Sequence, residues 1–311
     1  MQKTVGGIGG NEVPYIETTS MIDRIRSHPL VLLIVGFAVI IGFTYIAGTA
    51  SVALYDLLGN SDWTELLSSV VAAASAILGY WLFALVVERK PLADFALAGA
   101  GREWLFGVAI GFGVMTAVIG VIALGGGYRI AGYNGAHVLV KMLAIAITSG
   151  VIEEILLRGL FFRMIEKWLG SWTALVLSAA LFGFAHIANP NSSVLAAIAI
   201  ALEAGILLAA LYMLTRRLWA VIGLHMAWNF TQGGIYGVAV SGFEIDGVIR
   251  PVIGGPDLLT GGAFGAEASL PAIVICTAVG LYFLYRARTA GQFVAPSWHR
   301  FKTGEALPQS A

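Results

Sequence analysis

Two adjacent glutamates and an arginine, Glu153, Glu154 and Arg158, lie in an apolar stretch that is long enough to cross a membrane. An ionisable side chain inside a bilayer costs at least about 2.5 kcal/mol, so its presence there indicates a function. Two later apolar stretches carry the imidazoles of His186 and His225. Carboxylates and imidazoles can take a proton from water, which is the chemistry of a hydrolase. These residues therefore predict a hydrolytic site inside a membrane.

The spacing of Glu153, Glu154 and Arg158 predicts different roles for the two glutamates. Residues four apart share a face of a helix, whereas adjacent residues point about 100° apart. Glu154 and Arg158 are four apart and can pair within the helix. This pairing would neutralise Glu154 and leave Glu153 pointing elsewhere. Glu153 is therefore the candidate for chemistry, and Glu154 the candidate for structure.

The same four-residue spacing occurs twice more along the chain. Phe182 precedes His186, and His225 precedes Asn229, so each pair presents one face of its helix. The Asn229 amide can donate a hydrogen bond to a developing oxyanion. A third carboxylate, Glu203, interrupts another apolar stretch. The sequence leaves open whether Glu203 supports the structure, the site or the handling of a substrate.

The composition indicates the class of protein. Of 311 residues, 58% are hydrophobic and 12% are charged, against about 25% charged residues in soluble domains. The net charge is zero, so nothing points to a nucleic-acid partner. Cys276 is the only cysteine, which excludes a disulfide framework and a cysteine metal site. We expect an integral membrane protein in a bacterial or archaeal cell membrane.

Eight apolar stretches of 16 to 23 residues come close to the roughly 20 that a membrane helix needs. They predict an all-α fold, a polytopic membrane helical bundle with about eight transmembrane helices. Residues 1–28 are expected to be a flexible tail, 29–286 the bundle with its catalytic core over 138–232, and 287–311 a second tail. The predicted spans are 30–50, 66–87, 104–124, 138–160, 171–187, 194–214, 218–240 and 270–285.

The distribution of Lys and Arg predicts the orientation, because cytoplasmic loops carry an excess of them. Basic residues precede the first span, follow the last, and occupy the connections on the same side. Both tails are thus expected to be cytoplasmic, and the connection 241–269 non-cytoplasmic, as either a folded cap or a flexible lid. The site is expected to be reachable from the cytoplasmic side. The opposite side holds little beyond Arg129, Lys141 and Arg250.

The three motifs, in order on successive spans, resemble the CAAX protease and bacteriocin-processing family (CPBP, or Abi). These intramembrane endopeptidases include the Ras-converting enzyme. The resemblance covers roughly residues 138–232 and not the flanking spans. It implies a substrate that is a membrane-associated protein or peptide, lipidated or not. The motifs are Glu153-Glu154-x-x-x-Arg158, Phe182-x-x-x-His186 and His225-x-x-x-Asn229.

This resemblance also implies a role for each motif residue. Glu153 would be the catalytic glutamate, and with His186 it would position and deprotonate a water molecule. His225 and Asn229 would stabilise the tetrahedral oxyanion. The remaining charged pair of the first motif would hold its helix in place.

Other readings of the same residues stay open. Glu153, His186 and His225 are also residue types that bind zinc, although no His-Glu-x-x-His motif is present. We expect a metal-free mechanism without a cofactor, with zinc as the alternative. Intramembrane carboxylates and histidines also relay protons in transporters. A non-proteolytic membrane scaffold that keeps the fold is a further alternative.

Overall fold

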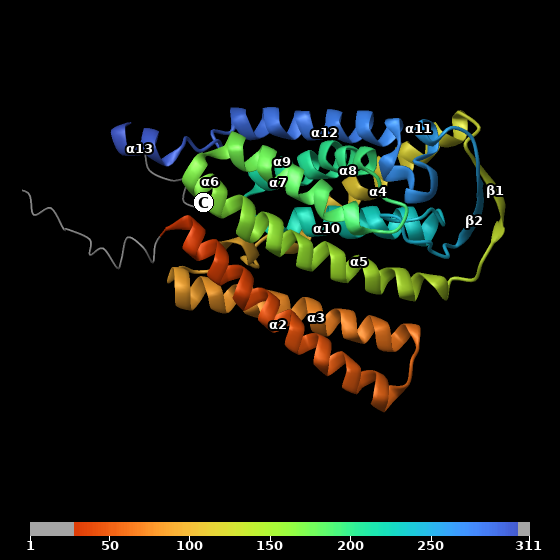
Figure 1. Ribbon diagram of the computed structural model, residues 1–311, viewed down its shortest axis with the longest axis horizontal. Coiled ribbons are helices and arrows are strands. Elements are labelled where there is room, and N and C mark those ends of the chain that lie inside the picture. Colours follow the sequence, from red (N-terminus) through yellow and green to blue (C-terminus); the bar gives the residue numbers. More distant parts are fainter. Residues whose placement is uncertain (1–27, 304–311) are drawn as a thin grey trace, which may run out of the picture.

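The computed structural model describes residues 28–303, which form a bundle of long helices with a small β-sheet at one end (Figure 1). The predicted tail over residues 1–28 lies almost wholly outside the described residues. The helices and π-helical turns (η) are α2 (Pro29–Leu58), α3 (Asp62–Leu82), η1 (Phe83–Glu88), α4 (Ala100–Leu124), α5 (Val138–Glu154), η3 (Ile155–Phe162), α6 (Arg163–Leu169), α7 (Ser171–Ala185), α8 (Val194–Ile200), η5 (Ala201–Gly205), α9 (Ile206–Thr215), α10 (Leu218–Asn229), η6 (Phe230–Ile235), α11 (Asp257–Thr260), α12 (Leu270–Thr289) and α13 (Ser297–Thr303).

Six helices in the described part of the chain are long and apolar enough to cross a membrane. They make the chain an integral membrane protein of mostly helical fold. The two other predicted spans are also continuous helices, over 138–169 and 218–235. These two carry the polar motif residues, which lower their apolar character. The count of eight spans therefore stays a prediction. The six helices are Pro29–Leu58, Asp62–Glu88, Ala100–Leu124, Ser171–Ala188, Val194–Thr215 and Leu270–Thr289.

Helices α9 and α10 form the centre of the bundle. Within Val194–Thr215, 67% of the most apolar window is buried, against 28% for Pro29–Leu58. Ten of the twelve residues of α10 are buried. An apolar helix in a membrane can face lipid, whereas α10 is covered by its neighbours on nearly every side. The polar residues of α10 are thus held where water is scarce.

Glycines allow α4 and α10 to approach closely. A Cβ atom on Gly107 of α4 would collide with the backbone carbonyl of Ala220. A Cβ atom on Gly223 of α10 would collide in turn with the carbonyl of Trp104. Small residues drive helix association in membranes because they let backbones touch. This contact fixes the position of α10, which carries the third motif.

A helical hairpin turns at Gly170. Gly170 has φ of 82°, a conformation that favours glycine, and it separates α6 from α7. Its neighbour Ser171 donates a hydrogen bond to Glu166 over 2.5 Å. The turn sets η3, which carries Arg158 of the first motif, against α7, which carries Phe182 of the second.

Buried ion pairs join the connections at the same end of the bundle. Arg163 binds Glu88 through two hydrogen bonds of 2.9 and 2.5 Å. Arg216 likewise binds Glu166 over 2.5 and 3.1 Å. Bidentate arginine–carboxylate pairs are strong and directional. Arg163 and Arg216 lie at the end that the distribution of Lys and Arg predicts to be cytoplasmic. Their ion pairs also hold the helices together at this end.

The opposite end carries a folded cap, which corrects the all-α prediction. Strands β1 (Tyr128–Tyr133) and β2 (Ile249–Ile253) pair antiparallel, with a bulge near Gly132. Of the two alternatives for the connection 241–269, the folded cap is right. Its strand is only five residues long, too short to stand out in a chain dominated by apolar helices.

The second predicted tail, 287–311, is helical in part. Helix α12 continues to Thr289, three residues into the predicted tail, and α13 follows at Ser297–Thr303. The C-terminal end of α12 carries Arg286 and Arg288, where basic side chains complement the helix dipole.

The orientation gives the first testable prediction. In a Cys276→Ser background, Gly254→Cys places a thiol on the exposed cap where an added Cβ meets no other atom. Thr289→Cys places one on the exposed end of α12. A membrane-impermeant maleimide should label Gly254→Cys in intact cells and Thr289→Cys only after permeabilisation. The reverse labelling pattern would overturn the predicted orientation.

Candidate hydrolytic site

The buried carboxylate of Glu154 joins two of the motifs. Its Oε1 atom accepts a hydrogen bond from Arg158 over 3.0 Å, which confirms the predicted ion pair within the helix. The same atom lies 2.8 Å from Nδ1 of His225 on α10. Glu154 and Arg158 are both 0% exposed. An ionised carboxylate only accepts hydrogen bonds, so Nδ1 of His225 carries the proton. The sequence did not reveal this second partner of Glu154.

The ring of Phe182 lies among the charged and polar groups of the three motifs. The guanidinium of Arg158 sits 4.7 Å from its centroid, a cation–π contact. The imidazoles of His186 and His225 pack edge-on to the same ring at 5.0 and 5.9 Å. A single aromatic side chain therefore spaces both histidines and covers the arginine. The sequence placed Phe182 on the face of His186, and the structure confirms this.

His186 follows the last residue of α7 and is held in one tautomer by its own helix. Its Nδ1 atom lies 2.7 Å from the backbone oxygen of Phe182. A carbonyl can only accept, so Nδ1 carries the proton and Nε2 has a free lone pair. The half-buried ring thus presents a proton acceptor, as a general base requires.

Asn229 and Glu153 lie on the two helices that the Glu154–His225 bond joins. The amide of Asn229 donates to Oγ of Ser149 on α5 over 2.9 Å. Glu153 is half-buried, and within residues 28–303 no group donates a hydrogen bond to it. Its charge acts on Arg158 and on His225. Glu153 thus lies outside the Glu154–Arg158 ion pair, as the spacing predicted.

A narrow cavity of about 20 Å³ brings the candidates His186, His225 and Asn229 together. That is room for about one water molecule. Glu153 does not line this cavity, whereas Glu203 of η5 does. One oxygen of Glu203, Oε2, is buried without a hydrogen-bond partner. Of the three roles left open for Glu203, its position fits the support of the site.

A further carboxyl group, that of Glu267, lines this cavity and was not predicted from the sequence. It comes from the cap, is 3% exposed, and accepts a hydrogen bond from the backbone N–H of Ser241. Burial raises the pKa of the Glu267 carboxyl, while the nearby His186 and the contact with Ser241 lower it. Glu267 carries no sequence signal, because it lies in a connection with other acidic residues.

The cap also fixes the backbone that follows His186. The side-chain amides of Asn189 and Asn191 donate to the carbonyls of Ser241 and Gly242 over 3.0 and 3.2 Å. Irregular backbone beside a membrane helix needs such partners. The site therefore lies against the cap, on the opposite side from the expected cytoplasmic approach. The reason is that α7 runs its full length from the Gly170 turn before His186 is reached.

Three π-helical turns adjoin the site. η3 begins after Glu154, η5 contains Glu203, and η6 begins after Asn229. Such turns insert one extra residue into a helix and re-aim the side chains that follow, and they are frequent at functional sites. An argument from ideal helical spacing does not contain these turns, although the Glu154–Arg158 pair forms with Arg158 inside η3.

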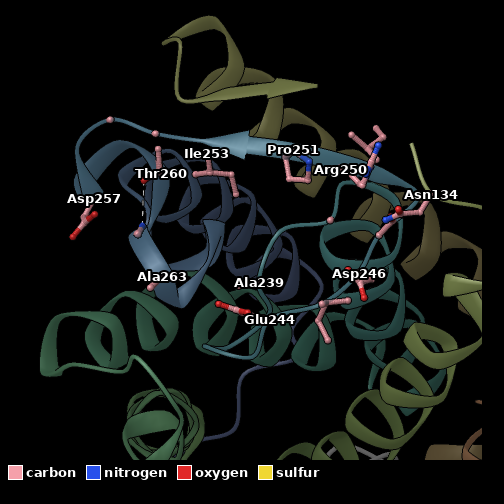
Figure 2. A pocket seen from close by; sticks show the side chains of 17 residues that line it. Asn134, Ala239, Glu244, Asp246, Arg250, Pro251, Ile253, Asp257, Thr260 and Ala263 are labelled. Atoms are coloured by element: carbon pink, nitrogen blue, oxygen red, sulfur yellow. Dashed lines mark hydrogen bonds between the residues drawn. The ribbon is translucent and has the colours of Figure 1, made fainter. Parts of the chain in front are cut away.

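A second and wider cavity of about 810 Å³ lies within the cap itself. Figure 2 shows Glu244, Asp246, Asp257 and Arg250 around it. It contains none of the residues predicted to act in hydrolysis. Its lining belongs to the cap and to the ends of the strands, so it is separate from the narrow cavity.

The residues named for a zinc site do not form a metal-binding group. Among residues 28–303, no three His, Cys, Asp or Glu side chains are placed to hold one ion. Nδ1 of each histidine is engaged, by a carbonyl at His186 and by a carboxylate at His225. A metal would therefore need both Nε2 atoms and a movement of Glu153.

The segment that carries the three motifs matches a known protein family. Residues 135–231 match the family described as type II CAAX prenyl endopeptidase Rce1-like. The match runs from just before α5 into η6, so it includes all three motifs but not Glu267. No curated protein and no solved structure matches the chain.

The buried pair of α5 gives a stability prediction. Arg158→Met leaves Glu154 as a buried charge without its cation, which typically costs about 3–5 kcal/mol. The melting temperature in detergent should fall sharply, and Glu154→Leu in the same chain should restore much of the loss. As a control, Glu103→Gln breaks a pair with Arg217 whose side chains are 27% and 18% exposed, and should cost about 1 kcal/mol or less. A melting temperature of Arg158→Met equal to the wild type would contradict the prediction.

Proposed function

Residues 135–231 form an Rce1-like type II CAAX prenyl endopeptidase (CPBP) family domain, and on this premise we propose that the protein is an intramembrane endopeptidase. The match confirms the resemblance that the three motifs carry. One observation supports the proposal most strongly. Two histidines, each with Nδ1 engaged by an acceptor, line one cavity together with the Asn229 amide.

In the proposed reaction, the free Nε2 of His186 takes a proton from a water molecule as its oxygen attacks the scissile carbonyl carbon. In this proposal Glu153, which lies outside the cavity of His186, turns toward it and stabilises the imidazolium that forms. When the tetrahedral intermediate collapses, the C–N bond breaks. His186 then returns the proton to the leaving amine, so that one water is consumed and two peptides are released.

The oxyanion would be stabilised by His225 and Asn229. Since Nδ1 of His225 already donates to Glu154, a neutral ring has only an acceptor left at Nε2. To donate to the oxyanion, His225 has to be an imidazolium. The Glu154 carboxylate favours that charge, in the way that a buried aspartate supports the histidine of a serine protease. Glu154 would then contribute to catalysis through His225, beyond its structural role.

The proposed substrate is a peptide bond near the membrane. The cavity lies beside apolar helices, and the narrow space admits water sparingly, which suits a membrane-associated peptide. Lipidated peptides are the first class to test, because the name of the matched family refers to prenylated CAAX substrates.

Glu153→Gln tests the proposal most directly. The change keeps the shape but removes the charge, so kcat should fall about 10²–10⁴-fold while the melting temperature is unchanged. Cleavage of fluorogenic membrane peptides in detergent or liposomes would measure this. Glu65→Gln on α3, away from the site, should retain full activity. Wild-type cleavage by Glu153→Gln would remove the catalytic assignment of Glu153, whereas absence of cleavage by the wild type would favour a non-proteolytic scaffold or a transporter.

Metal dependence is predicted separately. A Glu–His pair that activates water needs no ion, so the purified protein should contain well under one equivalent of zinc and keep its activity after strong chelation. Elemental analysis and cleavage assays check both. Stoichiometric zinc, with activity lost on its removal and restored on its return, would make Glu153, His186 and His225 its ligands instead.

A further inference from the structure

The cap sends one acidic side chain into the candidate site. The exposed acidic residues of the connection 241–269 are Glu244, Asp246 and Asp257, and only Glu267 is buried. Burying a carboxylate is costly unless it is paired or hydrogen-bonded. Glu267 receives the backbone N–H of Ser241 and lines the cavity of the two histidines. Its burial at this place therefore calls for a role in the site.

A second buried carboxyl group, that of Glu203, lines the same cavity. Glu203 is 1% exposed, and its Oε2 has no hydrogen-bond partner. Oε2 of Glu203 is thus free to bond a guest, and Glu267, which lines the same cavity, has lone pairs beyond the one that accepts from Ser241. The cavity has room for about one water molecule. A water molecule in this cavity could donate its two hydrogens to acceptors among the residues that line it.

We propose that Glu267, together with Glu203, positions the attacking water on His186. The water would donate one hydrogen to Nε2 of His186 and the other to a carboxylate of this pair. That arrangement turns a lone pair of its oxygen toward the substrate carbonyl. Glu267 acts through the water and through His186, and is a positioning residue. The inference rests on the proposed endopeptidase function.

The proposed positioning residue belongs to the cap. Glu267 lies outside residues 135–231, the matched segment. The hydrogen bonds from Asn189 and Asn191 to the cap tie the backbone after His186 to the connection that carries Glu267. A shift of the cap would therefore move both groups that hold the water.

The experiment compares Glu267→Gln, Glu267→Asp and Glu244→Gln in steady-state cleavage of one peptide. Glu267→Gln should lower kcat about 10²-fold, the typical cost of misplacing a reacting group by about 1 Å, with KM changed less than about threefold. Glu267→Asp keeps the charge and should recover part of the loss. Glu244→Gln, an exposed change in the same connection, should behave as the wild type.

Melting temperatures separate positioning from stability. A kcat of Glu267→Gln equal to the wild type would overturn the inference. A loss that only follows the unfolded fraction, without recovery in Glu267→Asp, would overturn it too. If Glu267→Gln is active and Glu153→Gln is inactive, only this inference is contradicted. Absence of cleavage by the wild type would instead contradict the proposed function on which it rests.

Discussion

The carboxylate of Glu154 is the constraint on which the site depends. It is fully buried and shared between Arg158 on its own helix and His225 on α10. Inside a bilayer an unpaired charge of this kind is expensive, so the helices must hold their register to keep all three groups together. The same contact fixes the tautomer of His225 and thereby decides what its other nitrogen can do. Stability and chemistry are therefore coupled in one side chain.

Packing supplies the rigidity that this shared carboxylate needs. Helix α10 is buried almost throughout, and the close contact at Gly107 and Gly223 leaves it no freedom to slide along α4. Phe182 brings the third helix into place by contacting both histidines. Apolar attraction is weak between helices in lipid, so close backbone contact and polar bonds must hold the bundle. Both kinds of contact converge on the site.

The sequence predicted the parts of the site that follow from helical spacing. The Glu154–Arg158 pair and the shared face of Phe182 and His186 depend on a four-residue period within one helix, and both are present. The bond between Glu154 and His225 was not predictable, because it depends on how two distant helices are rotated. The same applies to the short strands and to Glu267, which reach their places only through the folded cap. The π-helical turns add a further rotation that ideal periodicity does not contain.

The cap explains how a water-consuming reaction can occur in an apolar bundle. A hydrolase in a membrane must admit single water molecules while it keeps bulk water out. Here the cap forms part of the cavity wall through Ser241 and Glu267, and it also satisfies the backbone that breaks after His186. The cap thus both closes the site and supplies hydrogen-bond acceptors to its lining. Because Glu267 and the partners of Asn189 and Asn191 come from the cap, the proposed site depends on the cap as well as on the motifs.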